Sequence, residues 1–164
     1  MTQQRNLKVN FADPFITIGQ AILVAKKHEG KVKSFKDLND GKYTITSKLG
    51  TTGEKATKEK MPKAKYRSFE TEIDAVLEVV NGKADAFVYD SPYCAVAYLQ
   101  KGQGKLVFLD KPFTYEPISF GVRKGDYDFV NWLNNFLNQT KNDGTYDKLY
   151  QKWFRSSDWL KDVQ

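Results

Sequence analysis

The stretch Lys48–Glu54, KLGTTGE, directly follows the alternating run Lys42–Ser47, KYTITS. The alternation predicts a strand, and the turn after it predicts the start of a helix. The first N–H groups of a helix lack partners and carry about half a positive charge, so the turn favours an anion. Two Thr hydroxyls beside those donors suit a carboxylate. Ordinary capping of the helix is the competing interpretation.

Composition excludes several classes of function. The 164 residues, 40% of them hydrophobic, suit one folded domain and argue against disorder. The net charge of +6 is spread along the chain without a nucleic-acid motif, so we expect no nucleic-acid partner. The single Cys94 and the single His28 exclude an internal disulfide and make a metal centre or His-based catalytic triad improbable. We therefore expect no metal and no cofactor. No signal segment opens the sequence, so we expect nothing in this chain to direct export.

Elements alternate along the first 122 residues. Helices are predicted at 53–60, around the spaced apolar residues 73–80, and at 91–100, with only a short helical turn at 34–37. Strands are predicted at 7–11, 18–25, 42–48, 65–69, 84–89, 105–109 and 118–122. This order predicts an α/β sheet with helices on both faces.

Two aromatic-rich helices are predicted after the sheet is complete. The first, capped by Asp126, places five apolar residues on one face: Phe129, Trp132, Leu133, Phe136 and Leu137. The second carries a stripe of Tyr146, Leu149, Tyr150 and Trp153.

Ligands of open α/β sheets bind beyond the carboxyl ends of the strands. Two such ends carry suitable chemistry here, the Gly50–Thr52 turn and Asp90. Together they offer one site for an anion and one for a cation, which fits the two charges of an α-amino acid. Simple helix capping together with Ser91 is an equally good interpretation of Asp90. Arg5 is either a surface residue or a bidentate clamp for a carboxylate.

Several segments resemble, in the same order, the polar amino acid-binding proteins that serve ABC importers, the type II periplasmic solute-binding proteins of family 3. The matching segments are Met1–Phe15, Gly19–Val24, Gly50–Gly53, Gly82–Ala86, Asp90, Gly121–Lys124 and Asp143–Phe154. The resemblance spans Met1 to Phe154. It implies an α/β lobe of the periplasmic-binding-protein-like II type, a three-layer αβα sandwich with about five strands.

The resemblance also assigns roles to residues. Arg5 matches the arginine that grips the α-carboxylate of the ligand, and Thr2 matches a nearby hydroxyl. The Gly50 turn with Thr51 and Thr52 matches the carboxylate cradle of the second lobe, through backbone N–H and hydroxyl groups.

Asp90 matches the acid that holds the α-ammonium group. Lys48 and Tyr89 fall where some members read the ligand's side chain, and Lys48 would suit an acidic or amide side chain. A solvated lysine is at least as good an interpretation of Lys48. Glu70 and Glu72 could favour a cationic ligand instead, although Glu is common near helix starts.

Members of this family have two lobes, and the resemblance implies that this chain lacks the first lobe. The expected parts are the end of the first lobe and the first crossover strand (1–12), the second α/β lobe (13–119), and the second crossover with the C-terminal helices (120–164). In the family those helices pack on the first lobe. We therefore predict a dimer or swapped assembly that covers their aromatic stripes, or helices folded back onto the second lobe. We also predict weak or absent ligand affinity.

The predicted function is the amino acid-binding component of an ABC importer, not an enzyme, periplasmic or extracellular by resemblance, with an ABC permease as partner of the intact protein. In that protein, closure of two lobes about the crossover strands would trap the ligand. The alternatives are an enzyme on the same fold, resembling cyclohexadienyl dehydratase or a lytic transglycosylase that carries this module, and the sensor module of a receptor.

Overall fold

The computed structural model describes residues 1–102, 104–156 and 158–159. The chain forms two compact units. Unit 1 comprises Met1–Thr17 and the chain from Pro117 onward, and unit 2 comprises Ile18–Glu116. The domain boundaries implied by the resemblance stay a prediction.

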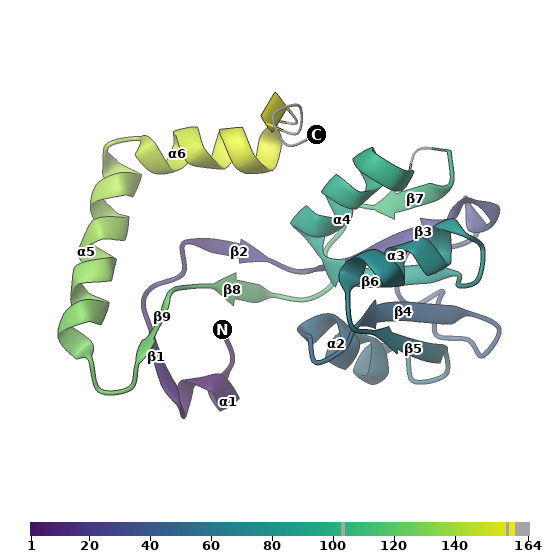
Figure 1. Cartoon of the computed structure of the whole chain (residues 1–164), viewed down its shortest axis with the longest axis horizontal. Helices are drawn as coiled ribbons and strands as arrows, with labels where there is room; N and C mark the ends of the chain where they lie inside the picture. The colour runs from purple at the N-terminus through teal and green to yellow at the C-terminus, as the bar shows by residue number, and fades with distance from the viewer. Residues whose placement is uncertain (103, 157, 160–164) are drawn as a thin grey trace. The chain divides into compact units, whose positions relative to one another are not determined.

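Unit 2 is built on a five-stranded mixed sheet (Figure 1). In spatial order its strands are β5 (Lys65–Phe69), β4 (Thr44–Lys48), β6 (Ala86–Asp90), β3 (Gln20–Ala25) and β7 (Leu106–Leu109). β4 pairs in parallel with β5 and β6, whereas β3 runs antiparallel to β6 and β7. The register places Gln20 opposite Asp90. The predicted α/β fold with about five strands is confirmed.

Both faces of this sheet are covered, so unit 2 has three layers. The helices are α2 (Thr52–Lys60), α3 (Glu72–Val80) and α4 (Ser91–Ala97), with the short turns η1 (Lys26–His28) and η2 (Tyr98–Gly102). On one face, residues of α3 and α4 pack on Leu23 and Phe87. On the other face, Val32, Leu38 and Met61 pack on the next residues of the same strands. All six residues of β3 are buried, as expected for a strand covered on both sides.

Unit 1 has a small core. Its elements are α1 (Gln3–Asn6), β1 (Val9–Phe11), β9 (Gly121–Arg123), α5 (Tyr127–Asn142), α6 (Thr145–Tyr150) and η3 (Gln151–Arg155). β1 pairs antiparallel with β9. The buried cluster of the described residues here consists of Ala12, Val122 and Leu133, with Val130 packed against it. Two further strands, β2 (Ile16–Ile18) and β8 (Glu116–Ile118), pair with each other where the chain passes between the units.

Three predicted strands differ from the observed ones. The strand predicted at 7–11 begins only at Val9, because residues 3–6 form a helical turn. The strand predicted at 18–25 is interrupted at Gly19, where a Cβ atom would lie 2.1 Å from the carbonyl oxygen of Thr114. The strand predicted at 118–122 is two strands, β8 and β9, interrupted at residues 119–120.

The five apolar residues predicted to share one face of α5 lie on two faces, one buried and one exposed. Leu133 and Leu137 are buried, but Phe129, Trp132 and Phe136 are 47%, 59% and 43% exposed. Their rings stack along the helix with centroids 5.9 Å apart in each pair. The aromatic residues therefore form an exposed row, which we call the α5 row. Among the described residues, no helix is long and apolar enough to cross a membrane.

Asp85 ties three segments of unit 2 together. One carboxylate oxygen lies 2.7 Å from Nε2 of His28 and 2.8 Å from Nζ of Lys27, and the other accepts the N–H of Thr44 at 2.9 Å. Burial raises the pKa of Asp85, but the hydrogen bonds from Lys27, His28 and Thr44 outweigh it, so its pKa lies below the ordinary value. The end of β3 is thereby fixed to the starts of β4 and β6.

We predict that Asp85→Ala lowers the free energy of unfolding by about 2 kcal/mol, because the part-buried N–H of Thr44 loses its side-chain acceptor. Urea denaturation measures the change. Asp40→Ala, which removes an exposed carboxylate paired with Lys42, is the control and should change the free energy of unfolding much less. Equal losses in the two variants would contradict the role of Asp85.

Candidate functional site

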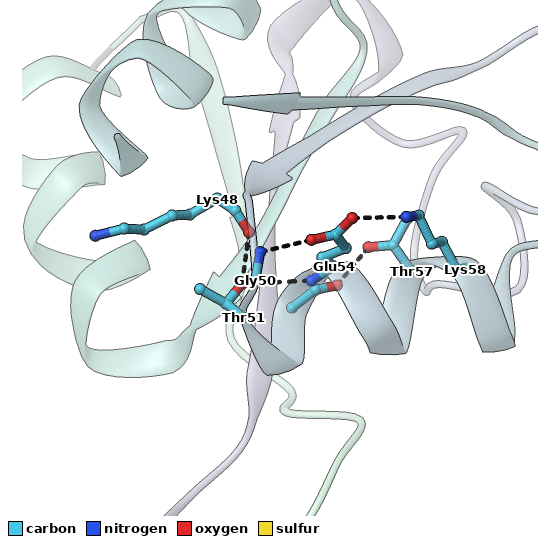
Figure 2. Close-up of polar contacts among 7 residues, drawn as sticks. Lys48, Gly50, Thr51, Glu54, Thr57 and Lys58 are labelled. Carbon is cyan, nitrogen blue, oxygen red and sulfur yellow. Dashed lines mark hydrogen bonds and ion pairs between the residues drawn. The ribbon is translucent and has the colours of Figure 1, made fainter. Parts of the chain in front are cut away.

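The turn after β4 uses most of its own polar groups to begin α2 (Figure 2). Thr51 is the N-cap residue, and its hydroxyl donates to the carbonyl oxygen of Lys48 at 2.7 Å. One oxygen of Glu54 accepts the N–H of Gly50 at 2.6 Å, and the other pairs with Lys58 at 2.6 Å. These contacts with Lys58 and Gly50 lower the pKa of Glu54. The Thr51 hydroxyl also accepts the N–H of Glu54 at 3.5 Å. The N–H groups of Thr52 and Gly53, which a helix cannot satisfy itself, are the donors left for an anion among the described residues.

Gly53 lets this helix start lie directly against the sheet. A Cβ atom there would lie 2.8 Å from Oε1 of Gln20, 2.8 Å from Oγ of Ser47 and 2.9 Å from the carbonyl oxygen of Val88. These atoms belong to three different strands, β3, β4 and β6. The N-terminus of α2 is therefore set close to the end of β6.

The side chain of Gln20 links that helix start to Asp90. Its Nε2 donates to Oδ1 of Asp90 at 2.7 Å and to Oγ1 of Thr52 at 3.2 Å. Gln20 is fully buried. The carboxylate of Asp90 makes no capping hydrogen bond to α4, so the capping interpretation of this residue is wrong. Asp90 and the Gly50–Gly53 turn lie at the same edge of the sheet, and we call them the rim site.

Asp90 is a carboxylate without a cation. Burial raises the pKa of Asp90, the hydrogen bond from Gln20 lowers it, and the nearby charge of Glu116 raises it further, with a net rise. Within the described residues no Lys, Arg or His pairs with Asp90. The oriented Asp90 carboxylate could therefore accept hydrogen bonds from the ammonium group of a ligand.

Lys48 and Tyr89 have partners inside unit 2. Nζ of Lys48 lies 2.8 Å from Glu72, and this ion pair is half-buried. The ring of Tyr89 packs on those of Phe87 and Tyr93, at centroid distances of 5.7 and 5.3 Å. The positive charge that was expected to read an acidic or amide side chain is thus already neutralised by Glu72.

Thr2 and Arg5 belong to unit 1, whereas the other predicted site residues belong to unit 2. The hydroxyl of Thr2 accepts the backbone N–H of Arg5 at 3.2 Å and caps α1. Arg5 is exposed, and its guanidinium makes no ion pair within the part of the chain that the structure describes. It is available for a carboxylate.

Two residues of the site were not assigned a role from the sequence. A role for Gln20 could have been predicted from the sequence, because it is a polar residue in a strand that is otherwise apolar and fully buried. No such pattern marks Glu116. Its carboxylate accepts the hydroxyl protons of Thr52 and Thr114 at 2.7 and 2.8 Å, from segments 64 and 2 residues away. In the described residues no group of three His, Cys, Asp or Glu is placed to hold a metal ion.

The chain belongs to the bacterial extracellular solute-binding proteins, family 3, whose model matches residues 1–156. A crystal structure of a putative binding component of an ABC transporter from Wolinella succinogenes, complexed with lysine, is 49% identical with a TM-score of 0.94. It matches 98% of this chain, which covers 69% of that one. An ancestral amino acid-binding protein described as a precursor of cyclohexadienyl dehydratase is 51% identical with a TM-score of 0.84. That match includes 94% of this chain and 65% of the ancestral one.

Among curated proteins, the glutamine-binding protein GlnH of an ABC transporter from Bacillus subtilis is 33% identical over 156 residues. The match takes in 94% of this chain but only 55% of GlnH. The chain therefore spans little more than half the length of this curated relative. These relatives are binding proteins rather than enzymes, which fits a non-enzyme, and the family is extracellular or periplasmic.

We predict that Asp90→Asn stabilises the chain at neutral pH. The pKa of Asp90 is raised in the folded state, so ionisation opposes folding above that pKa, and the asparagine removes this cost while keeping an acceptor for Gln20. Thermal unfolding at a series of pH values should show a higher melting temperature for the variant at pH 7.

This difference should shrink as the pH falls through the pKa of Asp90, because the wild-type carboxyl then becomes neutral as well. Asp85→Asn is the matched comparison and should lower the stability at pH 7, because the pKa of Asp85 is lowered and its charge stabilises the fold at that pH. An Asp90→Asn variant that is less stable than wild type at pH 7 would contradict the raised pKa of Asp90.

Proposed function

We propose that this chain is the second lobe, with parts of the first, of an amino acid-binding protein that delivers its ligand to an ABC importer. The observation that carries the proposal is the half-buried carboxylate of Asp90, which no Lys, Arg or His of the described residues neutralises. It lies at the same sheet edge as the start of α2, and Gln20 links it to the Thr52 hydroxyl there. A cation acceptor and an anion donor on one rim suit the two charged groups of an α-amino acid.

The ligand proposed is an amino acid with a cationic side chain. Lys48, which would have favoured an acidic or amide side chain, is paired with Glu72. Asp90 and Glu116 add negative charge without a paired cation in the described residues. A relative that is 49% identical was crystallised with lysine, which supports the same class.

Arg5, an exposed arginine of unit 1, is proposed to bind a carboxylate. Its guanidinium has five donors in a planar fork that matches a carboxylate. The chain covers 55% of GlnH, so the complete ligand cleft, the permease partner and the transport activity belong to the proposal for the intact protein. We propose no enzymatic activity, because the relatives that the chain matches are binding proteins.

The proposal is tested by titrating L-lysine into ¹⁵N-labelled protein and following amide chemical shifts by NMR. We expect weak binding, with a Kd of about 1 mM or above, because few of the contacts of a two-lobed protein are present. The shifts should concentrate at Thr52, Gly53 and Asp90.

Two controls sharpen this experiment. Asp90→Asn should abolish the shifts, whereas Asp74→Asn, a carboxylate at the start of α3 that bonds the Thr71 hydroxyl, should leave them unchanged. Shifts that appear elsewhere, or that survive Asp90→Asn, would contradict the site. Micromolar affinity would contradict the claim that this chain holds only part of the cleft.

The exposed α5 row gives a second prediction about partners. Three stacked aromatic side chains that are 43–59% exposed are costly in water, because burying each contributes about 2 kcal/mol. We predict that this row is covered by a second copy of the chain in solution. Light scattering should give the mass of a dimer, and Trp132→Lys should give that of a monomer. A monomeric wild type whose row binds a hydrophobic dye would contradict the prediction.

A further inference from the structure

A closed circuit of four hydrogen bonds joins Gln20 to Glu116. The backbone N–H of Gln20 donates to Oγ1 of Thr114 at 2.8 Å, and that hydroxyl donates to Oε1 of Glu116 at 2.8 Å. On the other side, Nε2 of Gln20 donates to Oγ1 of Thr52 at 3.2 Å, and this hydroxyl donates to Oε2 of Glu116 at 2.7 Å. Each hydroxyl accepts from Gln20 and donates to Glu116.

The direction of every bond in the circuit is fixed. The N–H groups of Gln20 can only donate, so the two hydroxyls accept from them and have only their own protons left to give. Glu116 must therefore accept at both oxygens. The remaining hydrogen on Nε2 of Gln20 goes to Asp90 at 2.7 Å. Rotating the amide by half a turn would place its oxygen against the Asp90 carboxylate.

We propose that Glu116 is a positioning residue for the rim site: acting through Thr52 and Gln20, it fixes the Asp90 carboxylate in the orientation that holds the ligand's ammonium group. The ligand in this statement rests on the proposed function, but the circuit itself is a property of the chain alone.

A purely structural role explains Glu116 less well. Its negative charge disfavours ionisation of Asp90, so placing two carboxylates in one network costs free energy through their repulsion. A neutral amide could not replace Glu116 without loss, because it offers only one acceptor oxygen for the two hydroxyls. The pair of acceptor oxygens on Glu116 thus orients the Thr52 hydroxyl and, through it, the Gln20 amide that reaches Asp90. Glu116 is also the first residue of β8, so the strand that leaves unit 2 begins at this circuit.

The test is a double-mutant cycle of Thr52→Val and Glu116→Gln, read out as the pKa of Asp90. The carboxyl ¹³C shift of Asp90 is followed by NMR against pH without ligand, so failure of L-lysine to bind cannot be confused with failure of this inference. Thr52→Val keeps the shape and both charges. It should raise the pKa of Asp90, because Gln20 is held less well and donates a weaker hydrogen bond.

Glu116→Gln has two opposing effects in the wild-type background. Loss of the charge lowers the pKa of Asp90, and loosening of Gln20 raises it. In the Thr52→Val background only the effect of the charge remains. We therefore expect Glu116→Gln to lower the pKa of Asp90 by less in the wild type than in Thr52→Val. The two pKa shifts should differ by about 0.5 pH unit.

Equal shifts in the two backgrounds would show that Glu116 acts through charge alone and would overturn the proposal. An unchanged Asp90 pKa in Thr52→Val would overturn it as well, and this single variant decides the matter if Glu116→Gln does not fold. Glu59→Gln, which removes an exposed carboxylate elsewhere on α2, is the charge-matched control and should leave the pKa of Asp90 unchanged.

Discussion

The buried side-chain amide of Gln20 is the contact on which the rim site depends. A buried amide that lacks partners costs a few kcal/mol, so its two N–H groups must be satisfied, and Asp90 and Thr52 satisfy them. Its oxygen has no partner within the described residues and faces the space left by the absent side chain of Gly53. The amide can therefore bridge β3 to both the end of β6 and the start of α2 only because residue 53 is a glycine.

The mixed sheet explains why this bridge exists. β3 runs antiparallel to β6, so the first residue of β3 lies beside the last residue of β6. An entirely parallel sheet would place the start of one strand beside the start of the next. At the opposite end of the same two strands, Asp85 connects the start of β6 to η1 and β4. The strands are thus held by polar contacts at both ends and by apolar packing between them.

Unit 1 is stabilised differently from unit 2. Its buried cluster is small among the described residues, and its longest helix turns three stacked aromatic side chains outward. Such a surface is typical of an interface rather than of a free helix. The relatives extend well beyond the aligned region, as the 55% coverage of GlnH shows. The exposed α5 row, the small core and the guanidinium of Arg5 are therefore understood together, as parts that need a partner surface.

The sequence predicts most of the strands and helix starts through local periodicity, capping and glycine turns, but three of its predicted strands differ from the observed ones and it missed α1. It also placed Asp90 and the Thr51–Thr52 turn at strand ends, which are local positions. The contacts of these side chains depend instead on elements far apart in the sequence. The Thr52 hydroxyl donates to Glu116, 64 residues away, and Lys48 is neutralised by Glu72 from another element. No local pattern encodes such pairs, because they arise from sheet order and register.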